Sequence, residues 1–174
     1  TVSNQIKQKL LYLDDSAKGT ALKTSKAISV SDLKDNHEAL THLFTTILNH
    51  APHLYSIYLT DAQDNAFQMV NLFSPKIRNK LSVAPQERWL AITHRGSGKQ
   101  RISESIYLDS KLTLVRKTTE PSNFYPSQRF WYKNAQQDFV YRSDPYLFHH
   151  IKITGISYST QVANTDLVLG VDLS

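Results

Sequence analysis

The feature that most constrains the fold of this chain is a change of hydrophobic period at Pro52. Before Pro52, apolar residues recur every three or four positions, which is the spacing of one face of an α-helix. After it, apolar and polar residues alternate over several runs, which is the spacing of a half-buried β-strand. We therefore expect an α+β protein in which a long N-terminal helix packs on an antiparallel sheet.

Two helices are predicted before Pro52. The first carries a single apolar stripe and is interrupted near Gly19. The second begins at a cap supplied by Ser31 or Asp32 and ends at Pro52, because proline cannot continue a helix. Together they define an N-terminal helical segment over residues 1–50. The two stripes comprise Val2, Ile6, Leu10, Leu13 and Ala17, and then Leu40, Leu43, Phe44, Ile47 and Leu48.

The sheet is expected in the remaining residues, 51–174. Residues 54–60 and 66–73 alternate on either side of the turn sequence DAQDN, which predicts a hairpin. A second hairpin is predicted at the C-terminus, where the β-rich runs 150–160 and 167–174 flank the turn sequence ANTD. The two hairpins frame a middle region with a weaker pattern.

That middle region contains both strand-like and ambiguous stretches. Residues 101–109 and 111–119 have the pattern of strands, whereas residues 86–94 fit either a short helix or a strand. The stretch after Pro126 is typical of a short helix that Ser127 would cap.

Composition excludes several kinds of chemistry. The chain has no cysteine, which rules out disulfides, thiolate zinc ligands and a cysteine nucleophile. No apolar run approaches the roughly 18 residues that a membrane span needs, so we interpret the sequence as a soluble piece of a larger protein. The net charge of +5 is concentrated in residues 76–117, with ten Lys/Arg against three Asp/Glu. These charges are scattered among apolar residues, which favours a solvated face over a nucleic-acid surface.

No sequence motif indicates catalysis. The stretch RGSGKQR (95–101) lacks the spacing of a phosphate-binding loop, and no G-x-S-x-G nucleophile motif occurs. The seven histidines include no H-E-x-x-H metal motif. His149 and His150 are adjacent, so in a strand they would point to opposite faces. We expect a non-catalytic domain without cofactor or metal.

The stretch YPSQRFWYKNA (125–135) is the best candidate for a functional site. The guanidinium of Arg129 in this stretch could bind a carboxylate. The aromatic side chains around it would strengthen that ion pair by excluding water. Tyr125 lies one helical turn before Arg129 and could share its face. Equally, Phe130 and Trp131 could be core residues with Arg129 lying over them, and the residues alone leave both interpretations open. Stacking on nucleic acid is disfavoured because the aromatics lie apart from the basic segment.

Three ordered blocks resemble the Cache family of bacterial extracytoplasmic sensor domains. They are R-F-W-Y at 129–132, D-P-Y at 144–146 and, after the run ITGISYST, G-V-D-L-S at 170–174. The resemblance implies a PAS-like fold, in which a long N-terminal helix lies beside an antiparallel sheet of about five strands. It also implies that residues 51–174 form a sensor module, the membrane-distal one of a double Cache pair or a single one.

The resemblance to the amino-acid-binding members of the family implies a set of ligand-binding residues. Arg129 and its aromatic neighbours would enclose the ligand carboxylate, and Asp172 would hold its amine. Two positions depart from the family pattern: Tyr125 precedes Arg129 by four residues instead of five, and Phe148 replaces an aspartate. The implied ligand-binding residues are Tyr125, Arg129, Trp131, Tyr132, Tyr146 and Asp172.

Two hypotheses follow from these observations. In the first, the chain is the periplasmic sensing domain of an inner-membrane protein: a sensor histidine kinase, diguanylate cyclase, phosphodiesterase or chemoreceptor. It would bind a small carboxylate or amino acid, reach the membrane through flanking spans and dimerise through the N-terminal helix, with no nucleic-acid partner. In the second, it is a structural, dimerisation or protein-interaction module with no small-molecule ligand.

Overall fold

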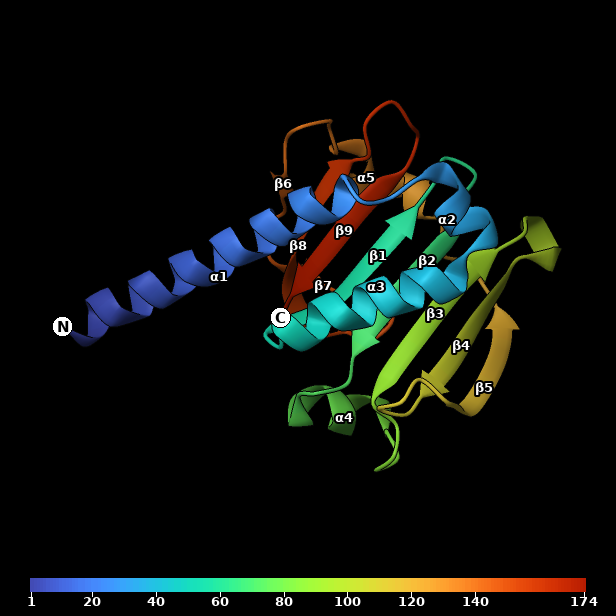
Figure 1. Ribbon diagram of the computed structural model, residues 1–174, viewed down its shortest axis with the longest axis horizontal. Coiled ribbons are helices and arrows are strands. Elements are labelled where there is room, and N and C mark those ends of the chain that lie inside the picture. Colours follow the sequence, from blue (N-terminus) through green and yellow to red (C-terminus); the bar gives the residue numbers. More distant parts are fainter.

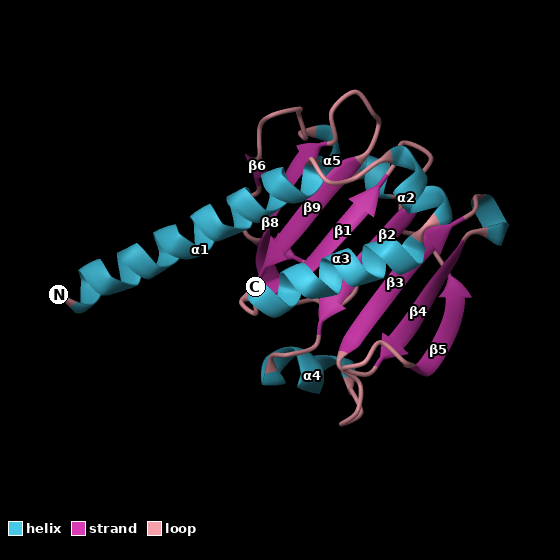
Figure 2. Ribbon diagram, viewed as in Figure 1, coloured by secondary structure: helices cyan, strands magenta, loops and turns pink.

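The structure is a computed structural model that describes residues 1–174, with five α-helices and nine β-strands (Figure 1, Figure 2). The α-helices are α1 (Val2–Ser25), α2 (Val30–Asp35), α3 (His37–His50), α4 (Pro75–Leu81) and α5 (Phe130–Lys133). The strands are β1 (Leu54–Thr60), β2 (Ala66–Asn71), β3 (Trp89–Arg95), β4 (Ile102–Leu108), β5 (Leu114–Pro121), β6 (Tyr141–Arg142), β7 (Tyr146–Leu147), β8 (Thr154–Gln161) and β9 (Val168–Leu173). Short 3-10 helices span Gly98–Gln100 and Pro126–Gln128.

One antiparallel sheet organises the molecule. Its strand order is β5-β4-β3-β2-β1-β9-β8-β6, and β7 also pairs with β8. Both predicted hairpins are present, as β1–β2 and β8–β9, and they join through the pairing of β1 with β9. Helices α1, α2 and α3 cover one face of the sheet, and α5 lies on the other (Figure 1).

The α+β class is confirmed, but the expected number of about five strands is wrong, because the sheet has nine. Strands β4 and β5 confirm the strand-like runs 101–109 and 111–119 and form one edge of the sheet. Strands β6 and β7 have two residues each, which is too short for alternation to show in a sequence. The ambiguous stretch 86–94 forms β3, since Leu90 and Ile92 fit against neighbouring strands on both sides.

The main hydrophobic core lies between the sheet and the helices, with 21 buried residues in one cluster. The predicted buried face of the second helix is confirmed by Leu40, Phe44 and Leu48. The Phe44 ring packs near the Phe67 ring of β2, with 6.0 Å between centroids, and Leu59 of β1 is wholly inaccessible to solvent. This side of the sheet is a closed apolar layer.

The segment predicted as one capped helix divides into α2 and α3, and neither Ser31 nor Asp32 is the cap. Ser29 caps α2 through a capping box with Asp32, whose carboxylate accepts from the Ser29 amide at 2.8 Å. Asn36 then starts α3, where its side-chain oxygen accepts from the Ala39 amide at 3.3 Å. Two consecutive caps therefore break the helix where periodicity alone showed one element.

Helix α1 is longer than the sheet it covers, so its apolar stripe is only partly buried. Ala17 is buried against the sheet, whereas Val2, Ile6 and Leu10 are 73%, 56% and 61% exposed. The exposed half projects away from the body of the molecule (Figure 1). None of the helices combines the length and apolar character needed to cross a membrane.

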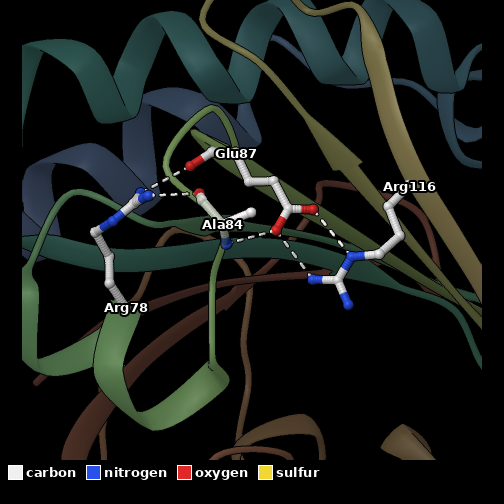
Figure 3. Close-up of polar contacts among 4 residues, drawn as sticks. All are labelled: Arg78, Ala84, Glu87 and Arg116. Atoms are coloured by element: carbon white, nitrogen blue, oxygen red, sulfur yellow. Dashed lines mark hydrogen bonds and ion pairs between the residues drawn. The ribbon is translucent and has the colours of Figure 1, made fainter.

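A polar network fixes the loop between α4 and β3 to the edge of the sheet (Figure 3). Glu87 is 1% exposed and accepts two hydrogen bonds from the Arg116 guanidinium, both at 3.0 Å, and one from the Ala84 amide at 2.8 Å. Arg78 donates to the carbonyls of Glu87 and Ala84 at 2.7 and 2.8 Å. Burial alone would raise the pKa of Glu87, but the bonds from Arg116 and Ala84 lower it overall.

Candidate functional site

The face of the sheet opposite the helices carries a row of cross-strand neighbours. The register aligns Tyr58 of β1, Gln68 of β2, Ile92 of β3 and Ser105 of β4. Because alternate residues of a strand point to opposite faces, this row faces away from the helices. Within the segment 122–153, α5 lies over this side of the sheet, whereas β6 and β7 pair with β8 at its edge (Figure 1).

A small cavity, here called the inner cavity, lies between this face and the covering segment. The centre of a water molecule can occupy about 50 Å³ of it. Its charged and polar lining comprises Thr60, Gln68, His94, Arg129, His149, His150 and Asp172. Its other walls are Tyr58, Ala66, Phe124, Trp131, Tyr146 and Phe148.

Two glycines allow aromatic rings to enter the wall of the inner cavity. A Cβ atom on Gly170 of β9 would overlap the ring of Tyr58, and one on Gly155 of β8 would overlap the ring of Phe148. The sheet backbone therefore lies directly under both rings, and no larger residue fits at either position without displacing them.

Arg129 is the residue just before α5, and it lines the inner cavity. Its Nε atom is buried and has no hydrogen-bond partner, and Arg129 forms no salt bridge. Its guanidinium lies 5.8 Å from the centroid of the Phe124 ring. A buried donor without an acceptor is costly, so this nitrogen is a ready site for an anionic oxygen.

Asp172 reaches the same cavity from β9. It is 4% exposed and accepts hydrogen bonds from Ser157 at 2.6 Å, Tyr58 at 3.0 Å and Ser56 at 3.1 Å. Burial raises the pKa of Asp172 to about 6, against the opposing effect of these hydrogen bonds. No lysine or arginine forms a salt bridge with Asp172, so a ligand cation would be its first charged partner.

Aromatic rings close the cavity around these two groups. Trp131 is buried and meets Tyr58 edge to face, with 4.9 Å between centroids. Tyr146 packs edge to face on Phe130 at 4.8 Å and on Phe148 at 5.3 Å. The Tyr146 hydroxyl also hydrogen-bonds Ser157, which joins it to the group around Asp172. These rings leave room for little water, and a low-dielectric wall of this kind strengthens charge interactions beside it.

The structure brings four of the six sequence-predicted residues together at the inner cavity: Arg129, Trp131, Tyr146 and Asp172. Tyr125 lies outside it, because its ring stacks on the buried Arg101 guanidinium at 4.7 Å. Tyr132 also lies outside, where its hydroxyl donates to the Asp166 carbonyl at 2.7 Å. The expected helix capped by Ser127 is instead a 3-10 turn followed by α5, so Tyr125 and Arg129 do not share a helical face.

Three histidines also line the cavity. His149 and His150 lie in a turn after β7 and not in a strand, so both can face the cavity. Burial lowers the pKa of His94 and of His150 to about 4, so both rings are neutral at physiological pH. The position of His94 on the cavity face could be predicted from the alternation along residues 89–95. The position of His149 could not, because no sequence pattern marks the turn in which it lies.

The side chains around the inner cavity show what it could bind. No cluster of three or more histidine or carboxylate side chains that could hold a metal ion is present. The inner cavity is lined by Arg129, which has an unpartnered guanidinium nitrogen, and by the buried carboxylate of Asp172, with aromatic rings beside both. A small zwitterion presents the complementary charges.

No family model and no curated protein matches this chain. Solved structures are similar to it in fold. One is the extracellular domain of a candidate histidine kinase, soHK1S-Z6, with a TM-score of 0.54 and 16% identity over 96% of this chain and 55% of that one. Another is the extracellular domain of a candidate histidine kinase, mmHK1S-Z3, with a TM-score of 0.45 and 13% identity over 98% and 54% of the two chains. The chain therefore spans about half the length of both.

Proposed function

We propose that this chain is the extracytoplasmic ligand-sensing domain of a bacterial membrane signalling protein, and that it binds a small carboxylate-bearing ligand. The observation that carries the proposal is Arg129, which lines the inner cavity and whose buried Nε atom has no hydrogen-bond partner. The ligand carboxylate would accept from this nitrogen, while Trp131 and Tyr146 enclose it. Such a charge-assisted bond in a water-poor site is stronger than the same bond at the surface.

The ligand we favour is an amino acid. Asp172 is a buried carboxylate with three hydroxyl donors and no cationic partner. A ligand ammonium would supply that partner and stabilise the ionised form of Asp172. Phe148 occupies the position where amino-acid-binding Cache domains carry a second carboxylate, so Asp172 would act alone.

A chain of contacts leads from the cavity to α1. Asp172 accepts from Ser157 of β8, and the next residue, Tyr158, donates to Asp14 of α1 at 2.8 Å. Arg142 of β6 also donates to Asp14 at 2.8 Å. Ligand binding at Asp172 would shift β8, and β8 would move α1, which serves as the output element.

The fold supports the same class of function. The extracellular domain of a candidate histidine kinase has a similar fold. In this proposal residues 51–174 are the sensor module that the Cache resemblance implies. In this proposal the domain is periplasmic, and flanking spans outside this sequence connect it to a kinase, cyclase, phosphodiesterase or chemoreceptor output. The domain itself would be non-catalytic.

A thermal-shift screen of amino acids and organic acids tests the proposal. We expect at least one compound to raise the melting temperature of the wild type and to lose that effect in Arg129→Ala. Arg95→Ala is the matched control, because Arg95 is half exposed and lies outside the inner cavity, and it should keep the shift. Stabilisation that persists in Arg129→Ala, or no stabilising compound at all, contradicts the proposal.

A second candidate function is a dimerisation module. The observation that favours it is the exposed stripe on α1, where Val2, Ile6 and Leu10 are more than half exposed. Two copies of α1 could bury these residues against each other. Analytical ultracentrifugation of the wild type and of Leu10→Glu tests this: a dimer that the substitution dissociates supports it, and a monomeric wild type contradicts it.

A further inference from the structure

A second pocket, here called the outer pocket, opens beside the inner cavity. It lies over β3 and β4 on the same face of the sheet, and its edge is formed by the end of β5 and the residues that follow it. His94, Phe124, His149 and His150 line both spaces. The two are therefore adjacent compartments with a common wall.

The sizes of the two compartments differ in a way that bears on the ligand. The centre of a water molecule can occupy about 50 Å³ of the inner cavity and about 300 Å³ of the outer pocket. The inner cavity has room for a carboxylate and an amine but little beyond them. A ligand with a long side chain must therefore extend across the common wall.

The common wall is a stack of rings that can rearrange. The Phe124 ring stacks on the His149 ring, with 4.7 Å between centroids and 29° between planes. The His94 ring also packs against the Phe124 ring, with 5.1 Å between centroids. His149 is exposed, and no hydrogen bond holds its ring. A rotation of His149 would open a passage, because only a ring contact keeps it in place.

The outer pocket is partly polar, and no lysine or arginine lines it. Its lining includes the hydroxyls of Ser103 and Ser105 and the amide of Asn123, none of which hydrogen-bonds within the protein. Its single charged residue is Glu120, which forms no salt bridge. The floor is apolar and includes Leu90 and Ile92. Burial lowers the pKa of His94 and His150 to about 4 and also lowers the pKa of His149, which favours the neutral form of all three rings.

We propose that the outer pocket is a second subsite for the distal group of the same ligand, and that it selects an amide, hydroxyl or cationic group over a carboxylate. The inference rests on the proposed function, because the inner cavity anchors the other end of the ligand. A distal carboxylate would meet Glu120 and acceptor oxygens with no cation to balance it, so it is disfavoured. An amide or cation would find acceptors on the two serines and Asn123.

Calorimetric titration of matched amino acids tests the subsite. Glutamine and glutamate have nearly the same shape, norleucine removes the distal polar group, and alanine does not reach the outer pocket. We expect glutamine to bind about tenfold or more tightly than glutamate, with norleucine between them. Ser105→Leu should weaken glutamine binding at least tenfold and leave alanine binding unchanged. Glu120→Gln should reduce the ratio of glutamine affinity to glutamate affinity.

The outcomes separate the two proposals. If alanine binds but glutamate binds as well as glutamine, or Ser105→Leu weakens both ligands equally, the subsite is wrong and the anchoring role of Arg129 stands. If none of the four binds the wild type, the amino-acid function fails and the subsite fails with it. Circular dichroism of Ser105→Leu establishes that the variant is folded; if it is not, Ser103→Leu on the same strand replaces it.

Discussion

The two faces of the sheet differ in how completely their side chains are packed. The helix face buries 21 residues in one cluster, whereas the opposite face divides into clusters of ten and three residues with a cavity between them. The cavity face also holds an unpartnered guanidinium nitrogen and a buried carboxylate, which a core designed only for stability would exclude. We conclude that packing on the helix face supplies most of the stability of the fold. The opposite face can therefore tolerate the unpartnered Arg129 Nε and the buried Asp172 carboxylate.

The largest expected effect comes from weakening the helix face. Phe44→Ala removes a ring that is inaccessible to solvent, so we expect a loss of about 3–5 kcal/mol in the free energy of unfolding. Urea denaturation measures it. Phe139→Ala is the matched control, because Phe139 is 52% exposed, and it should change stability by less than about 0.5 kcal/mol. Equal losses in both variants would contradict the division between the faces.

Asp172→Asn tests the cost of charge on the cavity face. Because the pKa of Asp172 is raised from 3.8 to about 6, the folded state retains a proton that the unfolded state releases. The wild type therefore loses stability as pH rises from about 4 to about 6, and the loss persists above that range. We expect the ligand-free variant to gain roughly 2 kcal/mol over the wild type at about pH 7.5 and almost nothing near pH 4.

Denaturation of both proteins at the two pH values measures this gain. His94 and His150 have the opposite effect, since their lowered pKa values add stability as pH rises, but they are common to both proteins and cancel in the difference. A gain that does not depend on pH would mean that Asp172 is not the titrating group.

The polar network at the sheet edge should matter less than either face. Glu87→Gln leaves the Arg116 guanidinium without its carboxylate, but Arg116 is half exposed and water can solvate it. We expect a loss of about 1–2 kcal/mol by urea denaturation. In Glu104→Gln, whose partners Arg95 and Lys117 are both half exposed, the loss should stay below about 1 kcal/mol. A larger loss in Glu104→Gln than in Glu87→Gln would show that the network in Figure 3 does not stabilise the sheet edge more than an exposed ion pair does.

The smallest effect on stability is expected where α1 meets β8. Asp14→Asn weakens the contacts from Tyr158, Arg142 and Lys18. Tyr158 is buried, but both charged partners are nearly half exposed, so we expect a loss of about 0.5–1 kcal/mol. Its informative readout is hydrogen exchange of α1 with and without ligand. The wild type should show a ligand-dependent change in α1 that Asp14→Asn reduces; an undiminished change would exclude this contact from the coupling.

Much of the fold could be predicted because the sequence repeats its signal over long elements. The apolar face at Leu40, Phe44 and Leu48 and the alternation along 54–60 each persist for several periods. The capping by Ser29 and Asn36 was missed because several polar residues in that stretch are equally good caps. The two-residue strands β6 and β7 depend on pairing with β8 and have no local pattern.

The cavity could be predicted only in part. Arg129, Trp131, Tyr146 and Asp172 belong to short motifs, so resemblance was enough to select them. The positions of Tyr125 and Tyr132 depend on long-range contacts with Arg101 and Asp166, which spacing along the chain does not reveal. The contributions of Tyr58 and Gln68 follow from strand register, which only the assembled sheet defines.

A crystal structure of the domain with the most stabilising compound from the screen would test the central claim most directly. We predict that the ligand carboxylate lies within hydrogen-bond distance of Arg129 Nε and that its amine lies beside Asp172, with the aromatic rings closed around both. A ligand bound elsewhere, or one in the inner cavity that leaves Arg129 Nε without a partner, would contradict it.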